Sequence, residues 1–164
     1  KGFEKVISIS KYLHSNEINH SISVLGDGVN LHNYIKKIES LGIENNFKFY
    51  GFVNHNEIDD FMIKSDILIL LSESEGFPKV ISEGLINRVI PIVSNTGGVS
   101  HILDKIRIPL YFSSDQEKDV LQTINEIHRN PESFDYIWHD IEKKLYNFTY
   151  EYHIIQVKNL FKLS

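Results

Sequence analysis

The sequence predicts an α/β fold in which a Rossmann-like parallel sheet is flanked by helices. Short runs of branched apolar residues alternate with longer stretches whose apolar residues recur every three or four positions, which indicates strands alternating with helices. Runs such as Ile67–Leu71 contain no polar residue, as is typical of strands covered on both faces. Glycine and small polar residues follow several of these runs, where a strand would turn into a helix. No long linker, low-complexity tract or repeat interrupts the 164 residues, so we expect one domain, 1–164.

The composition argues against several classes of protein. A net charge of −5 without a basic run argues against a nucleic-acid partner. The absence of cysteine excludes disulfides, thiol catalysis and thiolate metal sites, and it fits a reducing cytoplasm. No apolar run approaches the roughly 20 residues that a membrane span requires. The eight histidines form no HxxxH or HExxH pattern, and neither a P-loop nor a Gly-x-Ser-x-Gly elbow is present, so we expect no metal site, nucleotide triphosphatase or serine hydrolase.

The first predicted element is an amphipathic helix that begins almost at the first residue. Its apolar face comprises Phe3, Val6, Ile7 and Leu13. A βα architecture places a strand before such a helix. We therefore infer that the first strand, and with it a preceding domain, is missing from this chain. The alternative is that the helix itself begins the domain.

Two strand–helix units follow. Ser21–Leu25 predicts a short buried strand, and the helix after it ends at Gly42, a residue that commonly stops helices. Phe47–Tyr50 predicts the next strand, and Asn54 or Asn56 can cap the helix that comes next. These units give the βαβ alternation that a parallel sheet requires.

The central unit begins with the strand Ile67–Leu71 and reaches a second strand at Val89–Val93. Pro78 fits the first position of the helix between them, where its missing N–H is not needed. Polar and glycine-rich loops follow both strands, Ser72–Phe77 after the first and Ser94–Gly98 after the second. We expect another helix to begin after the second loop.

The last third of the chain adds one strand and more helices. Leu110–Phe112 predicts the last strand, and the helix after it ends near Asn130-Pro131. A further helix is predicted by the apolar stripe of Phe134, Ile137, Trp138, Ile141 and Leu145. The final segment, Tyr150–Leu163, carries apolar residues on more than one helical face, from which we hypothesise that it contacts a second body.

The loops of the central unit predict a binding site. They leave the carboxyl ends of parallel strands, so they share the edge of the sheet where ligands bind. The backbone amides of Lys79, Val80 and Ile81 lack partners at the start of a helix, which favours an anion such as pyrophosphate. Gly97-Gly98 would let a second backbone segment approach that anion without a Cβ clash. Glu83 can accept two hydrogen bonds from a vicinal diol such as a ribose.

Several motifs in this order resemble one known family. Glu75-Gly76-Phe77-Pro78 followed by Glu83, with seven residues between the glutamates, resembles the Glu-x7-Glu motif of retaining glycosyltransferases of family 4. Gly97-Gly98 falls where that family has its own pair. The similarity extends upstream to Lys1-Gly2, Gly26-Asp27-Gly28 and Gly51-Phe52-Val53. The resemblance implies that the chain is the C-terminal, donor-binding half of a two-domain GT-B glycosyltransferase.

The resemblance also implies roles for individual residues. Glu75 is the catalytic candidate and would contact hydroxyls of the transferred sugar, while Glu83 would bind the ribose hydroxyls. Gly76, Phe77 and Pro78 would offer backbone contacts to sugar or phosphate. The other donor-binding positions that it implies are Lys1 at the pyrophosphate, Gly26 and Gly28 beside the donor, Phe52 and Val53 beside the nucleobase, Lys79 and Val80 at the helix start, and Asn95, Thr96, Gly97 and Gly98 bordering the phosphates.

The same residues have other interpretations. Glu75 and Glu83 could be the acid/base pair of a glycosidase. Glu83 could also be a surface glutamate that pairs with Lys79 at i, i+4. The turn Gly26–Gly28 could simply join a strand to a helix, and Phe52-Val53 could belong to the core.

The sequence departs from the family pattern at four positions. Gly84 follows Glu83 where alanine is common, and Arg88 replaces a glycine before the next strand. The usual proline lies one place later, at Pro91, and His101 stands where an acidic residue is common.

The implied function is transfer of a hexosyl-type sugar from a UDP- or GDP-linked donor to a glycan or lipid-linked acceptor, with retention and without a metal or other cofactor. Helix-end amides and cationic side chains would stabilise the departing diphosphate. The acceptor site would belong to the missing N-terminal domain, so this chain alone would be inactive. By analogy the protein would be bacterial, cytoplasmic or peripheral to the inner face of the membrane, and active in polysaccharide biosynthesis. Competing interpretations are a nucleotide-sugar epimerase or phosphorylase of the same architecture, or a non-catalytic nucleotide-sugar-binding module.

Overall fold

The computed structural model describes residues 2–73, 79–108, 110–113, 116–139 and 141–146. The strands within these ranges are β1 (Ile22–Leu25), β2 (Phe47–Gly51), β3 (Ile67–Leu70), β4 (Ile90–Ser94) and β5 (Tyr111–Phe112). The α-helices are α1 (Phe3–Ser15), α2 (Leu31–Ser40), α3 (His55–Met62), α4 (Lys79–Ile86), α5 (Val99–Lys105), α6 (Glu117–Arg129) and α7 (Ile141–Tyr146). Two 3₁₀ helices, η1 (Glu44–Asn46) and η2 (Pro131–Ile137), complete the description.

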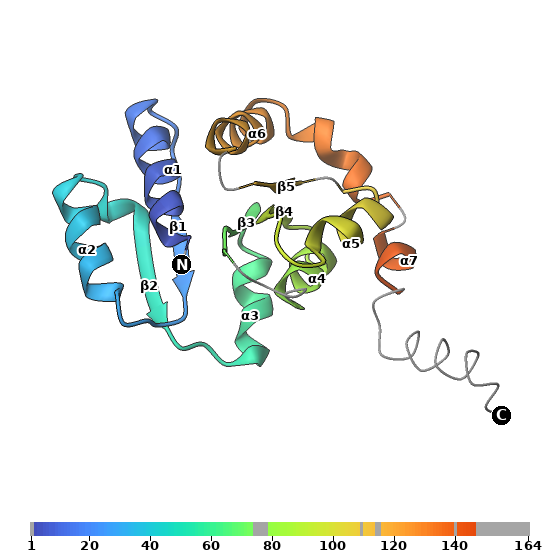
Figure 1. Cartoon of the computed structure of the whole chain (residues 1–164), viewed down its shortest axis with the longest axis horizontal. Coiled ribbons are helices and arrows are strands. Elements are labelled where there is room, and N and C mark those ends of the chain that lie inside the picture. The colour runs from blue at the N-terminus through green and yellow to red at the C-terminus, as the bar shows by residue number, and fades with distance from the viewer. Residues whose placement is uncertain (1, 74–78, 109, 114–115, 140, 147–164) are drawn as a thin grey trace.

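The strands pair in parallel and are flanked by helices, which confirms the predicted α/β class (Figure 1). A helix lies between the two strands of each parallel pair, α2 between β1 and β2, α4 between β3 and β4, and α5 between β4 and β5, and returns the chain to the starting edge as parallel pairing requires. The parallel strands form two sheets in the described residues, a two-stranded sheet β1-β2 and a three-stranded sheet β3-β4-β5. The sequence predicted one sheet without this division, because apolar runs identify strands but do not identify their neighbours.

Two apolar clusters correspond to the two sheets. The larger cluster gathers α4, α5 and α6 around the three-stranded sheet, and the smaller one lies between α1, α2 and the two-stranded sheet. Helix α1 belongs to both, because Ile9 and Leu13 lie in the larger cluster and Val6 and Ile7 in the smaller. Ile69 of β3 also packs against both clusters. The two halves are therefore joined through α1 and β3.

Four of the described helices end in the same way, with one residue in the left-handed region two positions after the helix. These residues are Glu17 (φ 57°), Gly42 (φ 66°), Arg88 (φ 60°) and Arg107 (φ 59°). The N–H of the following residue donates to a carbonyl five positions earlier, as from Ile43 to Ile38 (3.3 Å) and from Val89 to Gly84 (2.8 Å). This is the Schellman motif, which pairs carbonyls that a helix end would leave unpaired. The stop at Gly42 was predicted from the sequence, and the other three were not, since glycine is absent there.

One predicted element is wrong. The stripe from Phe134 to Leu145 does not form a single helix, because the 3₁₀ helix η2 is followed by the separate helix α7. Pro131 begins η2, and the turn at Trp138 is closed by a donation from its N–H to the Asp135 carbonyl (3.1 Å), three positions away. Such i to i+3 bonds wind the chain more tightly than an α-helix, so the stripe changes pitch along its length. The predicted tail helix over Tyr150–Leu163 lies outside the described residues.

Candidate functional site

The candidate residues follow the carboxyl ends of strands. Gly26 and Gly28 come after β1, Phe52 and Val53 after β2, and the turn 95–98 after β4. Because strands in each sheet run parallel, residues that follow them share the carboxyl edge of that sheet. Lys79 and Val80 begin α4, which follows β3, and therefore belong to the carboxyl edge of the three-stranded sheet.

Glu83 lies on α4 with its side chain directed toward the start of α3. The side chain is only 21% exposed, and its Oε1 lies 3.8 Å from Nδ1 of His55, the first residue of α3. Helix α3 begins just after the carboxyl end of β2, so this contact places the Glu83 carboxylate near the carboxyl ends of the strands, where the candidate residues lie. In the part of the chain that the structure describes, Glu83 contacts His55, an ion pair only when the imidazole is protonated, and makes no ion pair with Lys79, contrary to the surface-pair interpretation.

A second polar pair holds α3 against α4 one turn further along. Asn87 donates from Nδ2 to Oδ1 of Asp59 (3.0 Å) and also to the backbone carbonyl of Glu83 (3.0 Å). His55 and Asp59 are four positions apart on α3. Glu83 and Asn87 are also four positions apart, with Asn87 directly after the end of α4, so the two pairs lie one turn apart between the helices. Neither His55 nor Asn87 was predicted from the sequence. A spacing of four on each of two helices gives no signal that the helices face each other.

The turn after β4 is anchored at one end and open at the other. Asn95 donates its N–H to the carbonyl of Phe112 (2.8 Å), and the N–H of Thr96 bonds to the carbonyl of Ser94 (2.9 Å). Gly97 has a φ of 55°, and a Cβ added to Gly98 would meet nothing within 4 Å. The two glycines are therefore exposed beside a fixed turn, where a ligand can approach the backbone.

The turns after β1 and β2 are bonded to each other. Gly26, with a φ of 107°, donates its N–H to the carbonyl of Gly51 (2.7 Å), and Gly51 itself has a φ of 66°. The N–H of Gly28 bonds to the side chain of Asp27 (2.6 Å), as expected of a tight turn. Phe52 is 86% exposed, so the interpretation of this side chain as core is wrong.

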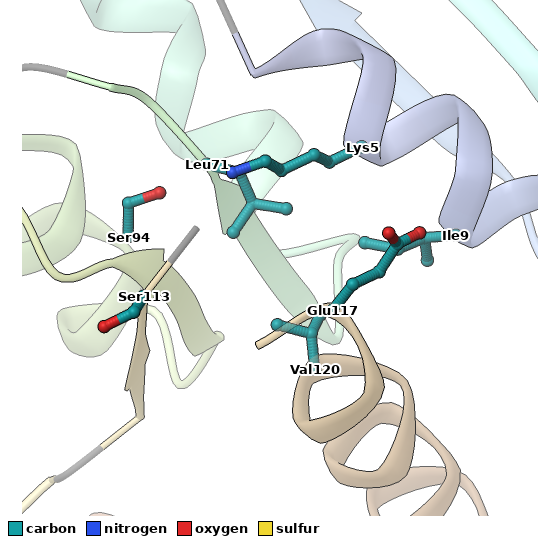
Figure 2. Close-up of a pocket in the computed structure, with 7 residues that line it drawn as sticks. All are labelled: Lys5, Ile9, Leu71, Ser94, Ser113, Glu117 and Val120. Carbon is teal, nitrogen blue, oxygen red and sulfur yellow. The ribbon is translucent and has the colours of Figure 1, made fainter. Parts of the chain in front are cut away.

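A small cavity lies at the carboxyl edge of the larger sheet. It has a volume of about 10 Å³ and is lined by Lys5, Ile9, Leu71, Ser94, Ser113, Glu117 and Val120. Figure 2 shows the Lys5 side chain extending from α1 toward Leu71, across from Ser94. This volume accommodates about one water molecule, so the cavity itself is too small for a nucleotide.

Five candidate residues lie outside the described ranges. They are Lys1, Glu75, Gly76, Phe77 and Pro78. The catalytic assignment of Glu75 and the backbone contacts of the next three residues therefore remain predictions.

Other polar features lie apart from the candidate residues. A hydrogen bond that Tyr111 donates to Asp104 (2.8 Å) raises the pKa of the Tyr111 phenol, and burial raises the pKa of Tyr136. Within the described ranges, no three His, Asp or Glu side chains gather in a way that could hold a metal ion. None of the described helices is both long and apolar enough to cross a membrane.

Comparison with known proteins supports a relationship to sugar-transferring enzymes. An uncharacterized glycosyltransferase of Methanocaldococcus jannaschii is 28% identical over 135 residues, which cover 80% of this chain and 36% of that protein. The GPI3 subunit of the phosphatidylinositol N-acetylglucosaminyltransferase of Saccharomyces cerevisiae is 23% identical over 150 residues, covering 90% of this chain and 33% of the subunit. The chain thus spans about a third of the length of these relatives.

The fold itself is found in solved structures. The sucrose-phosphate synthase of Thermosynechococcus elongatus superposes with a TM-score of 0.78 at 15% identity, over 99% of this chain and 42% of the synthase. The model of the family described as glycosyl transferases group 1 matches residues 1–143, which is most of the chain. The chain that carries Glu83 on α4 and the glycines at the strand ends therefore belongs to the glycosyl transferases group 1 family.

Proposed function

We propose that this chain supplies the donor site of a retaining, family 4-type glycosyltransferase that moves a sugar from a UDP- or GDP-sugar to a glycan or lipid-linked acceptor. The observation that carries the proposal is the position of Glu83. Its half-buried carboxylate faces the start of α3 at the edge where the strands end, which is where a nucleotide would lie in an α/β sheet.

The described residues suit the parts of such a donor. A carboxylate held on a helix can accept hydrogen bonds from both hydroxyls of a ribose, which is the role we assign to Glu83. The exposed glycines Gly97 and Gly98 suit the diphosphate because they have no side chain to block it, and the backbone N–H groups at the start of α4 would attract its negative charge. Glu75 would contact the transferred sugar.

The chemistry that this site would perform is electrostatic. A sugar leaves its nucleotide diphosphate as negative charge grows on the departing oxygen, and N–H dipoles and cations at the site would stabilise that charge. The reaction that we propose needs no metal. The acceptor would bind to an N-terminal domain of the full-length protein, so we propose that this chain alone transfers nothing.

The relatives give the proposal its chemical class. The yeast relative is named as part of an N-acetylglucosaminyltransferase that acts on phosphatidylinositol. A lipid-linked acceptor would place the full-length protein at the inner face of a membrane, and a bacterial polysaccharide pathway would place it in the cytoplasm. We propose these settings as alternatives within one activity.

Substitution of Glu83 tests the proposal directly. In the full-length protein, Glu83→Ala should weaken binding of a UDP- or GDP-sugar by about 1.5 to 3 kcal/mol, the scale of hydrogen bonds to a charged group. Isothermal titration calorimetry measures the change, which corresponds to roughly 10- to 150-fold in the dissociation constant. Glu39→Ala, at an exposed position of α2, is the matched control and should leave the affinity unchanged. Unchanged affinity in Glu83→Ala, with the control intact, would contradict the assignment.

A further inference from the structure

His55, the first residue of α3, contacts the carboxylate to which we assign the ribose. Its Nδ1 lies 3.8 Å from Oε1 of Glu83. The imidazole is 75% exposed, whereas the Glu83 side chain is only 21% exposed. An exposed ring thus lies against a carboxylate that its surroundings largely cover.

The backbone at His55 is held in place on both sides. Directly before it, Asn54 caps α3, since its N–H (3.1 Å) and its Nδ2 (3.0 Å) both donate to Oε2 of Glu57. One turn after it, Asp59 accepts a hydrogen bond from Nδ2 of Asn87 (3.0 Å), which directly follows α4. Figure 1 shows the two helices side by side. The start of α3 therefore has a fixed position relative to α4.

Glu83 projects from an equally well fixed part of α4. Its carbonyl accepts hydrogen bonds from the N–H (3.2 Å) and from Nδ2 (3.0 Å) of Asn87. The next residue, Gly84, is buried, and a Cβ added there would lie 3.2 Å from Cδ2 of Leu68, so the helix packs closely on β3 at this point. The backbone of Glu83 is thus fixed, and its freedom of movement lies in the rotatable bonds of its side chain.

The neighbouring charged groups on both helices do not hold that side chain. Glu57 and Asp59 on α3 have partners of their own, described above. Lys79, one turn before Glu83 on α4, makes no ion pair with it in the described residues. Within these ranges, the polar side-chain contact that restricts the Glu83 carboxylate is therefore the one with His55.

The distance between the two side chains has a chemical consequence. At 3.8 Å it exceeds the length of a hydrogen bond, so His55 attracts the carboxylate without occupying a lone pair of either oxygen. Nδ1 carries a proton in the imidazolium and in one neutral tautomer, so this attraction does not require a charged ring. His55 thus leaves both oxygens of Glu83 available to the two hydroxyls of a ribose.

We propose that His55 is a positioning residue for donor binding, which keeps the Glu83 carboxylate directed at the ribose site before the donor arrives. The role rests on the proposed function, because it acts through Glu83. Restricting a flexible side chain in advance removes an entropic cost that binding would otherwise carry. A contact with an exposed ring adds little to folding stability, so its effect is expected in donor affinity.

Binding of UDP and GDP to the full-length protein, measured by isothermal titration calorimetry, tests this role. For the nucleotide that binds, His55→Ala should weaken the affinity about threefold to tenfold, the cost of restricting one side chain, and leave the melting temperature nearly unchanged. His55→Asn should restore most of the loss, because its amide N–H lies close to the position of Nδ1. His128→Ala, at the exposed far end of α6, is the matched control and should bind like the wild type.

Two comparisons separate positioning through Glu83 from a general structural role. The 2′,3′-dideoxy form of the same nucleotide lacks the ribose hydroxyls, so His55→Ala and the wild type should bind it equally. In the Glu83→Ala background, His55→Ala should change the affinity by less than about twofold, because the side chain that it positions is gone.

The outcomes distinguish the role of His55 from the donor site on which it depends. Suppose that Glu83→Ala binds weakly, while His55→Ala binds like the wild type or loses affinity equally for the dideoxy nucleotide. The positioning role is then refuted, and the donor site stands. If the wild type binds neither nucleotide, or if Glu83→Ala binds as tightly as the wild type, the proposed function fails and the positioning role fails with it.

Discussion

The two halves of the molecule reach stability by different means. Among the residues that the structure describes, the cluster around β3-β4-β5 contains 20 buried residues, mostly aliphatic, whereas the cluster around β1-β2 contains five. The smaller half adds aromatic contacts, with the ring of Phe3 centred 5.0 Å from Tyr34 and that of Phe47 6.1 Å from Phe49. Two of its five buried residues come from α1, which also packs on the larger half. The smaller half therefore depends on a helix that it shares.

The largest expected effect comes from breaking the junction of the two halves. Gly2→Ala places a Cβ against the Leu71 carbonyl at a φ of 82°, so both the contact and the left-handed conformation become unfavourable. We expect the free energy of unfolding to fall by at least about 3 kcal/mol, measured by urea denaturation. Gly28→Ala is the control, since its Cβ would meet nothing within 4 Å, and should change stability by less than about 0.5 kcal/mol. Equal effects of the two substitutions would contradict the geometry of the junction.

A matched pair of core truncations compares the halves directly. Ile92 of β4 (0% exposed) and Ile38 of α2 (1% exposed) are both fully buried, one in each cluster. Truncation to alanine costs about 2 to 5 kcal/mol, depending on how far the surroundings collapse into the space. We expect a loss of about 3 kcal/mol for Ile92→Ala, because its neighbours are enclosed, and of about 2 kcal/mol for Ile38→Ala. Denaturant titration of both variants gives the difference. A larger loss for Ile38→Ala would mean that the smaller half is the more rigidly packed.

The smallest expected effect concerns the two equivalent helix ends, one in each half. Gly42 and Arg88 occupy the same left-handed position after α2 and α4. Gly42→Ala should lower the free energy of unfolding by about 1 kcal/mol, because a Cβ is unfavourable there. Arg88→Gly should raise it by up to about 1 kcal/mol, the relief of the same strain being partly offset by the flexibility that glycine adds to the unfolded chain. Thermal denaturation distinguishes the two, and shifts of the same sign would refute the equivalence.

Much of the fold could be predicted from the sequence because local patterns determine it. The apolar runs gave the strands within about one residue, as at Val89–Val93 against the observed Ile90–Ser94. The sequence offered Asn54 or Asn56 as the capping residue of α3, and the structure selects Asn54, whose N–H bonds to Oε2 of Glu57 (3.1 Å).

What could not be predicted depends on contacts between distant segments. The division of the sheet and the contact of His55 with Glu83 require knowledge of which elements are neighbours. The left-handed turns at Glu17, Arg88 and Arg107 escaped prediction for a different reason. Their side chains do not favour this conformation, and the apolar residue that follows each turn compensates by packing on the core, with Val89 and Ile108 buried and Ile18 partly buried. For the candidate site, the sequence predicted residues at strand ends, and the roles of those residues await the donor-binding experiments.

The repeated Schellman ends have a consequence for how this protein can change. They hold four of the connections that run from a helix into the amino end of the next strand. In each connection, a buried or half-buried apolar residue follows the left-handed residue and donates its N–H back to the helix. Insertions at this rim would disturb hydrogen bonds and core at once. The opposite rim has open glycines and exposed side chains, so its loops can vary in length and sequence at little expense to folding. New specificities can therefore arise on one side of the protein while the other keeps the architecture constant.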